Sequence, residues 1–168
     1  NERRLVPSAR YEQAFAPRFS HDGKRVAYSA WTRGGYRDIR VVEVKTGKFW
    51  QVTRDVALDQ QPAWSADDRY LYFTSDRTGI ANVYAYDMAT ARLRQVTNVI
   101  TGAYAPAPSP DGKTLAYLGY TADGFGLFSM PLDPATWLEP EDPPDGRASP
   151  HPASGGGRAC RWGQSGNE

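Results

Sequence analysis

The sequence has very few of the residues that build disulfides and metal centres. It contains one cysteine, Cys160, and two histidines, His21 and His151. A single cysteine cannot form a disulfide within the chain, and these three residues do not have the spacing of a zinc site. We therefore predict no metal site and no cofactor.

Charge excess and long apolar runs are also missing. The formal net charge is +1 over 168 residues, so nothing draws the chain electrostatically towards nucleic acid or an anionic membrane. No run approaches the roughly 18 apolar residues of a membrane-spanning helix, and the first residues lack an apolar signal region. We expect no nucleic-acid partner and no transmembrane segment, and a chain starting with Asn1 indicates a processed product or a piece of a longer protein.

What the sequence does contain is a repeat. Pro17, Pro62 and Pro106 lie 45 and 44 residues apart. Each begins a similar stretch, in which an aromatic residue or a proline is followed by a serine, an aspartate and then alternating apolar residues. The three stretches run over residues 16–29, 62–73 and 106–117. Asp38–Val44 matches Asn82–Asp87 in the same register, as Gln51–Thr53 matches Gln95–Thr97.

A period of 40–45 residues with several short β-type runs is typical of a propeller blade. We predict an all-β fold, a β-propeller fragment of four-stranded antiparallel blades, at about 16–53, 61–97 and 105–132. Arg3–Val6 lies one period before Trp50–Thr53, so we interpret residues 3–6 as the last strand of a preceding blade. The predicted strands are Pro17–Ser20, Lys24–Ala30, Asp38–Val44, Lys48–Thr53, Gln61–Ser65, Arg69–Thr74, Asn82–Tyr86, Leu93–Thr97, Ala105–Ser109, Lys113–Leu118 and Leu127–Met130.

The composition changes after the third unit. Pro131 and Pro134 stand where a fourth strand should begin, and proline cannot donate to a ladder. Seven of the 13 prolines and six of the 16 glycines lie from residue 131 onwards. We therefore divide the chain into a partial propeller, residues 1–132, and a disordered Pro/Gly-rich tail or linker, residues 133–168.

These repeats resemble a known family. The motif Pro-x-Trp-Ser-x-Asp-x-Arg at residues 62–69, Ser-Pro-Asp-Gly-Lys at 109–113 and the two Gln-Val-Thr endings are similar to TolB-like, WD-like β-propeller repeats. The resemblance covers about residues 3–132. It implies a channel lined by the first strand of each blade and, most often, a bacterial periplasmic or secreted setting.

No stretch reads convincingly as a catalytic or metal site. Ser20-His21-Asp22 has the letters of a catalytic triad, but neighbours on one tight turn cannot aim at one another, so we interpret it as a turn. Gly163–Gly166 falls short of a nucleophile elbow. One carboxylate per blade, from Asp22, Asp67 and Asp111, is too dispersed for a cation cage.

Two positions depart from the repeat, and the aromatic residues admit two explanations. Asp68 stands where the other units have Gly23 and Gly112, so we expect a strained positive φ that Asp68→Gly would relieve by about 0.5–1 kcal/mol. Pro108 replaces an aromatic residue. Aromatic residues near arginines can bind single-stranded nucleic acid, but sheet packing explains most of those here: Trp31, Tyr36, Trp50, Trp64, Tyr72, Phe73, Tyr84 and Tyr86.

The sequence thus predicts a non-catalytic scaffold for protein–protein interaction, within a larger bacterial extracytoplasmic protein. The alternative is the substrate-gating propeller of a prolyl-oligopeptidase-like serine peptidase. A third possibility, a sugar- or peptidoglycan-binding surface, would use exposed Trp31, Tyr36 and Phe125. Binding would involve the loops Trp31–Arg37, Asp76–Ala81 and Thr121–Gly126, and uncovered blade faces exposing Val26, Tyr28, Leu115 and Tyr117 could drive self-association.

Overall fold

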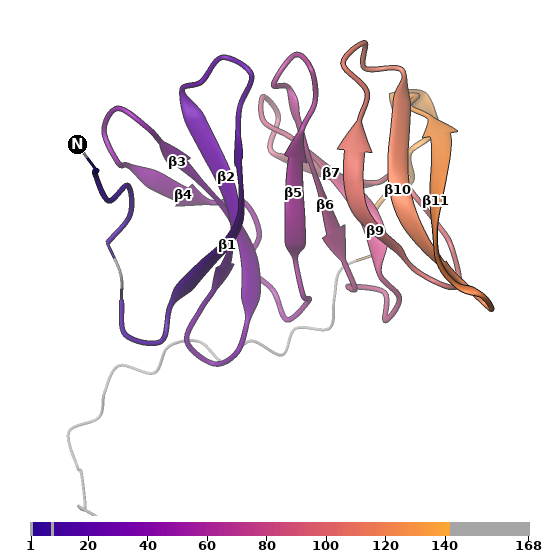
Figure 1. Cartoon of the computed structure of the whole chain (residues 1–168), viewed down its shortest axis with the longest axis horizontal. Helices are drawn as coiled ribbons and strands as arrows, with labels where there is room; N and C mark the ends of the chain where they lie inside the picture. The colour runs from indigo at the N-terminus through magenta and orange to yellow at the C-terminus, as the bar shows by residue number, and fades with distance from the viewer. Residues whose placement is uncertain (1, 8, 142–168) are drawn as a thin grey trace, which may run out of the picture.

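The computed structural model describes residues 2–7 and 9–141, and these form three antiparallel sheets in a row (Figure 1). The first sheet has the order β1-β2-β3-β4, the second β5-β6-β7-β8 and the third β9-β10-β11. Every sheet is a meander in which consecutive strands pair, as short turns between alternating apolar and polar runs require. The predicted propeller-fragment architecture is confirmed, and among the described residues the third sheet has three strands.

The strand bounds follow the predicted ones to within a few residues. In the first sheet they are β1 (Gln13–Phe19), β2 (Arg25–Trp31), β3 (Arg37–Glu43) and β4 (Phe49–Gln51). In the second they are β5 (Gln60–Trp64), β6 (Tyr70–Ser75), β7 (Asn82–Asp87) and β8 (Arg92–Gln95). In the third they are β9 (Ala103–Pro108), β10 (Thr114–Thr121) and β11 (Gly124–Pro131).

The core lies between the sheets. Side chains alternate along a strand, so one face of the first sheet turns Ala27, Ile39 and Val41 towards the second sheet. Larger, fully buried side chains of the second sheet pack against them: Leu71, Phe73 and Tyr84. The other face of the second sheet packs on the third in the same way, so most of the predicted blade aromatics are core residues.

The first strands of the three sheets share a bulge. Ala16, Gln61 and Ala105 have positive φ angles of 48°, 57° and 52°, and the ladder to the next strand shifts register beside each of them. An extra residue in one strand bends it and increases its twist. The three first strands also contact one another along the row, which is the arrangement expected of channel-lining strands.

Two local predictions were wrong. Residues 3–6 form no strand: Leu5 and Val6 lie in a bend and pack on the first sheet. The segment Thr121–Gly126, predicted as a loop, is mostly strand, because β10 and β11 continue into it and only Ala122 and Asp123 lie between them. Gly124, with φ of 104°, lets the chain reverse within that tight turn.

The end of the third unit also differs from the prediction, and this difference accounts for the unusual Pro108. Trp64 of β5 packs against the first sheet and lies under Arg25, 4.8 Å from its guanidinium. At the next interface that aromatic is Pro108, and Trp137 takes its place, 5.0 Å from the ring of Tyr70. The packed chain therefore extends past residue 132, through η1 (Pro134–Thr136) to Leu138, which bridges to Gln95 of β8. Residues 142–168 of the predicted tail lie outside the described residues.

Candidate functional site

The strands of all three sheets run between the same two ends of the molecule (Figure 1). The β1–β2, β5–β6 and β9–β10 turns lie at one end, together with the β3–β4 and β7–β8 turns; we call this the turn end, at the top of Figure 1. The β2–β3, β6–β7 and β10–β11 connections and the β4–β5 and β8–β9 loops lie at the opposite end, which we call the loop end. The predicted binding loops are at the loop end.

The turn end repeats one hydrogen-bonded motif three times. In the first turn the Ser20 hydroxyl donates to Asp22 Oδ1 at 2.6 Å, Asp22 accepts from the backbone N–H of Lys24, and Ser20 Oγ accepts from the N–H of Arg25. The second and third turns repeat these bonds, with the hydroxyl–carboxylate distance again 2.6 Å. The corresponding residues there are Ser65, Asp67, Arg69, Tyr70, Ser109, Asp111, Lys113 and Thr114.

These bonds make the three aspartates structural. The serine hydroxyl is the main reason that the pKa of Asp22 falls to about 2, and it lowers the pKa values of Asp67 and Asp111 in the same way. Ser20 donates to Asp22 and not to His21, so the turn interpretation of Ser20-His21-Asp22 is confirmed. In the described part of the chain no group of three or more His, Cys, Asp or Glu side chains is placed to hold a metal ion.

Asp68 has a role that the repeat pattern did not predict. Its φ of 57° confirms the left-handed conformation shared with Gly23 and Gly112. Its carboxylate, however, accepts from the backbone N–H groups of His21 and Asp22 at 2.7 and 2.9 Å, and it lies 3.1 Å from His21 Nδ1. Asp68 therefore joins the turns of two neighbouring sheets, which glycine could not do.

The Gln-Val-Thr segments bond to the third strands next to the loop end. Thr53 Oγ1 accepts from the N–H of Ile39 at 2.9 Å, and Thr97 Oγ1 accepts from that of Val83 at 2.8 Å. Each threonine hydroxyl thereby accepts a backbone N–H group near the start of a third strand, beyond the point where the short fourth strand ends. These segments fix where the β4–β5 and β8–β9 loops leave the sheet.

A buried charge cluster lies between the β4–β5 loop and the β6–β7 connection. The Arg77 guanidinium contacts Asp55 and Asp59 at 3.3 and 3.4 Å and stacks 4.8 Å from the ring of Tyr84. Asp59 is fully buried, and burial raises the pKa of its carboxyl to about 7 against the opposing charge of Arg77. Arg77 and Asp59 are buried, and Arg77 also donates to Ser75 in β6, so the cluster acts as a support.

The rim of the loop end carries exposed aromatic residues at the first sheet. Phe15 and Trp31 are 38% and 39% exposed, with ring centroids 6.1 Å apart. The Arg37 guanidinium lies 4.9 Å from the Trp31 ring and 5.5 Å from Phe15, and it donates to Gln60 Oε1 at 2.9 Å. The result is a rigid apolar patch with one held cation.

The third sheet carries a matching group at equivalent repeat positions. Tyr104 and Tyr120 both contact Phe125 edge-on, at 5.6 and 5.1 Å. In the second sheet the same positions hold the polar residues Gln60 and Asp76. Three further exposed apolar side chains lie in the loops of this end: Leu58, Ile80 and Ile100.

Sequence reasoning found part of this rim. Trp31 and Phe125 are exposed as expected, although both lie on strands, whereas Tyr36 is half-buried. Phe15, Tyr104 and Tyr120 were missed. Phe15 and Tyr104 could have been found by comparing the residues just before each bulge across the units, and Tyr120 by its repeat equivalence to Trp31. Gly163–Gly166, His151 and Cys160 lie outside the described residues.

No helix in residues 2–7 and 9–141 is long and apolar enough to cross a membrane. The chain is similar to several known proteins. A family model described as the TolB beta propeller domain matches residues 1–138. An uncharacterised protein of Agrobacterium fabrum is 29% identical over 115 residues, which are 68% of this chain and 38% of that protein.

Two further similarities point in different functional directions. The uncharacterised peptidase YuxL of Bacillus subtilis is 33% identical over 105 residues, covering 59% of this chain and 16% of the peptidase. The crystal structure of TolB from Acinetobacter baumannii superposes with a TM-score of 0.63 at 26% identity, over 74% of this chain and 31% of that one. The chain thus spans less than two fifths of the length of these relatives.

Proposed function

We propose, since this chain belongs to the TolB β-propeller domain family, that it is a non-catalytic scaffold whose loop end binds a partner protein. The observation that carries the proposal is the pair of exposed aromatic groups at the rim, around Trp31 and Phe125, on either side of a polar second sheet. Aromatic residues and arginine are enriched where protein interfaces are strongest. The likeness to TolB supports an extracytoplasmic setting.

The support beneath the rim fits this role. Leu58 N–H donates to Asp76 Oδ1 at 2.7 Å, which joins a loop of the first sheet to a loop of the second. Loops held by such bonds lose little conformational freedom on binding, and a preorganised surface binds more tightly for the same area. A partner would therefore meet a nearly rigid platform.

The proposal is tested by separating the two ends in one binding experiment. The chain is immobilised, exposed to extracts of bacterial envelopes, and any captured protein is identified, purified and titrated by calorimetry. The loop-end variant Trp31→Ser/Ile100→Ser should lose most of the affinity, whereas the turn-end control Lys24→Ser/Lys113→Ser should retain it. Equal affinity for both variants would contradict binding at the loop end.

The second candidate is the substrate-gating propeller of a serine peptidase, and the observation that favours it is the similarity to YuxL. In that case the rim would face a catalytic domain, and the coding sequence next to this segment would encode an α/β-hydrolase fold. Hydrolysis of fluorogenic peptides by the isolated chain would contradict the non-catalytic proposal directly.

A further inference from the structure

The third sheet has an edge that the other two sheets have filled. In the first two sheets a fourth strand pairs with the third, with Val41 opposite Trp50 and Ala85 opposite Arg94. In the third sheet no described strand pairs with the outer side of β11. Because Leu132 donates to Lys113 and ladder bonds alternate along a strand, the backbone groups of residues 127 and 129 point outwards from this edge.

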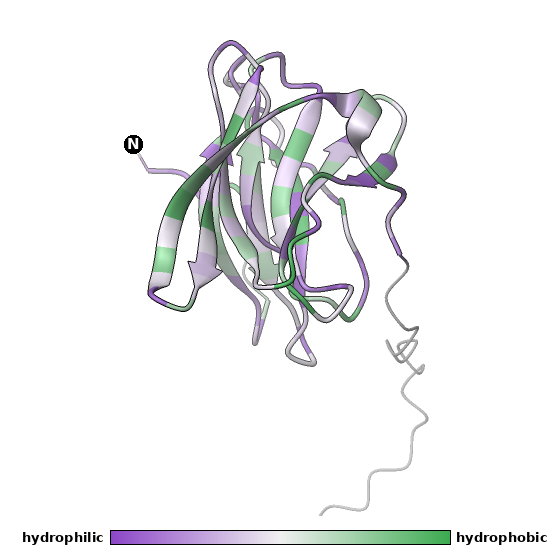
Figure 2. Ribbon diagram, turned by 90° about the vertical axis from the view of Figure 1, so that its right-hand side faces the viewer, coloured by the Kyte–Doolittle hydropathy of each residue, from purple (hydrophilic) through white to green (hydrophobic). Residues whose placement is uncertain are grey.

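The same sheet has an open face, formed by Ala116, Leu118, Tyr120, Phe125 and Leu127. Figure 2 looks onto this side of the molecule, where apolar segments recur along the strands nearest the viewer. Leu127 is 78% exposed, although its repeat equivalents Ile39 and Val83 are fully buried against a following sheet. The prediction that Val26, Tyr28 and Leu115 would be exposed was wrong: Leu115 faces the second sheet, whereas Leu5 and Val6 cover Val26 and Tyr28 on the outer face of the first sheet. Tyr117, the fourth residue of that prediction, is half-buried. The equivalent faces of the first and second sheets are each covered by the next sheet, whereas this face of the third sheet is open.

Residues 3–6 form no strand in the structure, but they have the repeat position of a fourth strand. Arg3–Val6 matches the fourth strands in repeat register, with Arg4 at the position of Trp50 and Arg94 and Val6 at that of Val52 and Val96. Six residues, 7–12, join it to β1, close to the eight and seven residues of the loops after β4 and β8. This segment and the unfilled edge lie at opposite ends of the described residues.

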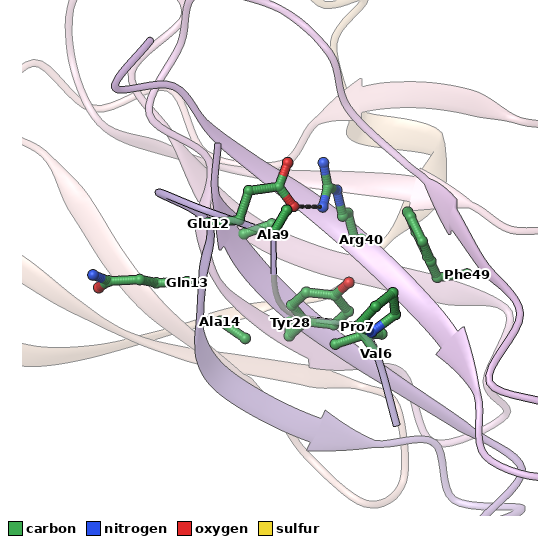
Figure 3. A pocket seen from close by; sticks show the side chains of 10 residues that line it. Val6, Pro7, Ala9, Glu12, Gln13, Ala14, Tyr28, Arg40 and Phe49 are labelled. Atoms are coloured by element: carbon green, nitrogen blue, oxygen red, sulfur yellow. Dashed lines mark hydrogen bonds and ion pairs between the residues drawn. The ribbon is translucent and has the colours of Figure 1, made fainter. Parts of the chain in front are cut away.

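In the structure this segment covers the back face of the first sheet imperfectly. Leu5 and Val6 pack against Val26 and Tyr28, the equivalents of the fully buried Leu71 and Phe73. A cavity of about 370 Å³ remains beside them, lined mainly by apolar residues (Figure 3). Figure 3 also shows the Glu12–Arg40 ion pair, 3.0 Å long, at the edge of this cavity. Two residues occupy space that a whole sheet fills at the other interfaces.

We propose that a second copy of this chain supplies its residues 3–6 as the missing fourth strand beside β11. The donated strand would run antiparallel to β11, with Arg4 of the donor opposite Ser129 of the acceptor, as Trp50 lies opposite Val41. The donor's first sheet would then rest on the acceptor's open face and bury Leu127. Added main-chain pairing at an exposed edge is an established way for chains to bind.

The contact is head-to-tail, so each copy both donates and accepts a strand. Such an interface forms a ring if its rotation closes and a filament if it does not. Two copies would bring six sheets together, which is within the 4–8 blades at which propellers close. A closed dimer would leave neither an unfilled edge nor an open face.

Cysteine pairs test the register on the full chain with Cys160→Ser. Chains carrying Arg4→Cys are mixed with chains carrying Ser129→Cys under mild oxidation, and disulfide-linked mixed dimers are counted by mass spectrometry. The control replaces Ser129→Cys with Thr114→Cys, which is also exposed on the third sheet but away from the open edge. We expect several-fold more mixed dimer with Ser129→Cys than with Thr114→Cys.

Sedimentation of the chain without added cysteines gives the second measurement. We expect its mass to rise towards a dimer with concentration, and Ser129→Pro to suppress this, since proline removes one outward N–H and is tolerated on edge strands. Equal linkage of Thr114→Cys and Ser129→Cys would overturn the proposal, as would a monomer at all concentrations. A dimer without the mixed disulfide would also overturn it and indicate contact between faces alone.

Discussion

The two ends of the sheets are built on opposite plans. At the turn end, one Ser-x-Asp motif with a positive-φ residue recurs with nearly identical hydrogen bonds in all three units. At the loop end the equivalent positions differ from unit to unit, aromatic in the first and third sheets and polar in the second. Repetition marks the part that folding requires, and variation on a rigid base marks the part free to acquire binding.

The largest expected loss of stability is at the loop end, because this variable end also contains the buried cluster around Arg77. Arg77→Leu leaves Asp59 and Asp55 without their cation, and we expect the free energy of unfolding to fall by about 3–5 kcal/mol at pH 8. Arg69→Leu at the turn end removes an ion pair between a solvent-exposed arginine and Asp87 and should cost less than about 1 kcal/mol. Urea melts of both variants measure the difference; equal losses would contradict the role of Arg77.

The next effect is a pH dependence that belongs to the loop end. Burial raises the pKa of Asp59 from 3.8 to about 7, so between these values the folded chain keeps a proton that the unfolded chain has lost. This contribution makes stability fall as pH rises from about 4 to about 7, by up to about 1.4 kcal/mol per pH unit, and stay constant above. Urea melts across this range should show the slope, and Asp59→Asn should remove it.

A smaller effect sharpens the account of the turn end. Asp68→Gly relieves a positive φ but removes two backbone N–H contacts to the neighbouring turn, so we expect a net loss of about 1 kcal/mol. This reverses the sign that the repeat pattern alone suggests. Gly112→Val, at a positive φ with no such contact to gain, should cost more than Asp68→Gly in the same thermal melts. A more stable Asp68→Gly variant would mean that the contacts contribute nothing.

The smallest effect is expected at the rim. Trp31→Ser and Ile100→Ser replace exposed side chains and should change the free energy of unfolding by less than about 0.5 kcal/mol each. Chemical denaturation checks this. A cooperative unfolding midpoint close to that of the unchanged chain would confirm that binding losses in these variants do not arise from unfolding.

The sequence by itself determined the repeat, the strands within each unit and the turns between them. These features are local: alternating apolar residues, a Ser-x-Asp turn and glycine at a positive φ act over a few residues. For the same reason the departure at Asp68 could be located, and its backbone conformation predicted, from alignment of the three units alone.

Only the tertiary structure decided which departures are compensated and which faces are covered. Asp68 bonds to a turn 46 residues away, and Trp137 packs on Tyr70 beside Pro108, where the repeat has no aromatic residue. The alternation that correctly predicts two faces for each strand cannot say which face meets a neighbour, so Leu115 is buried while Leu127 is exposed. These outcomes depend on how whole sheets stack, because burial is set by surfaces brought together from distant parts of the chain.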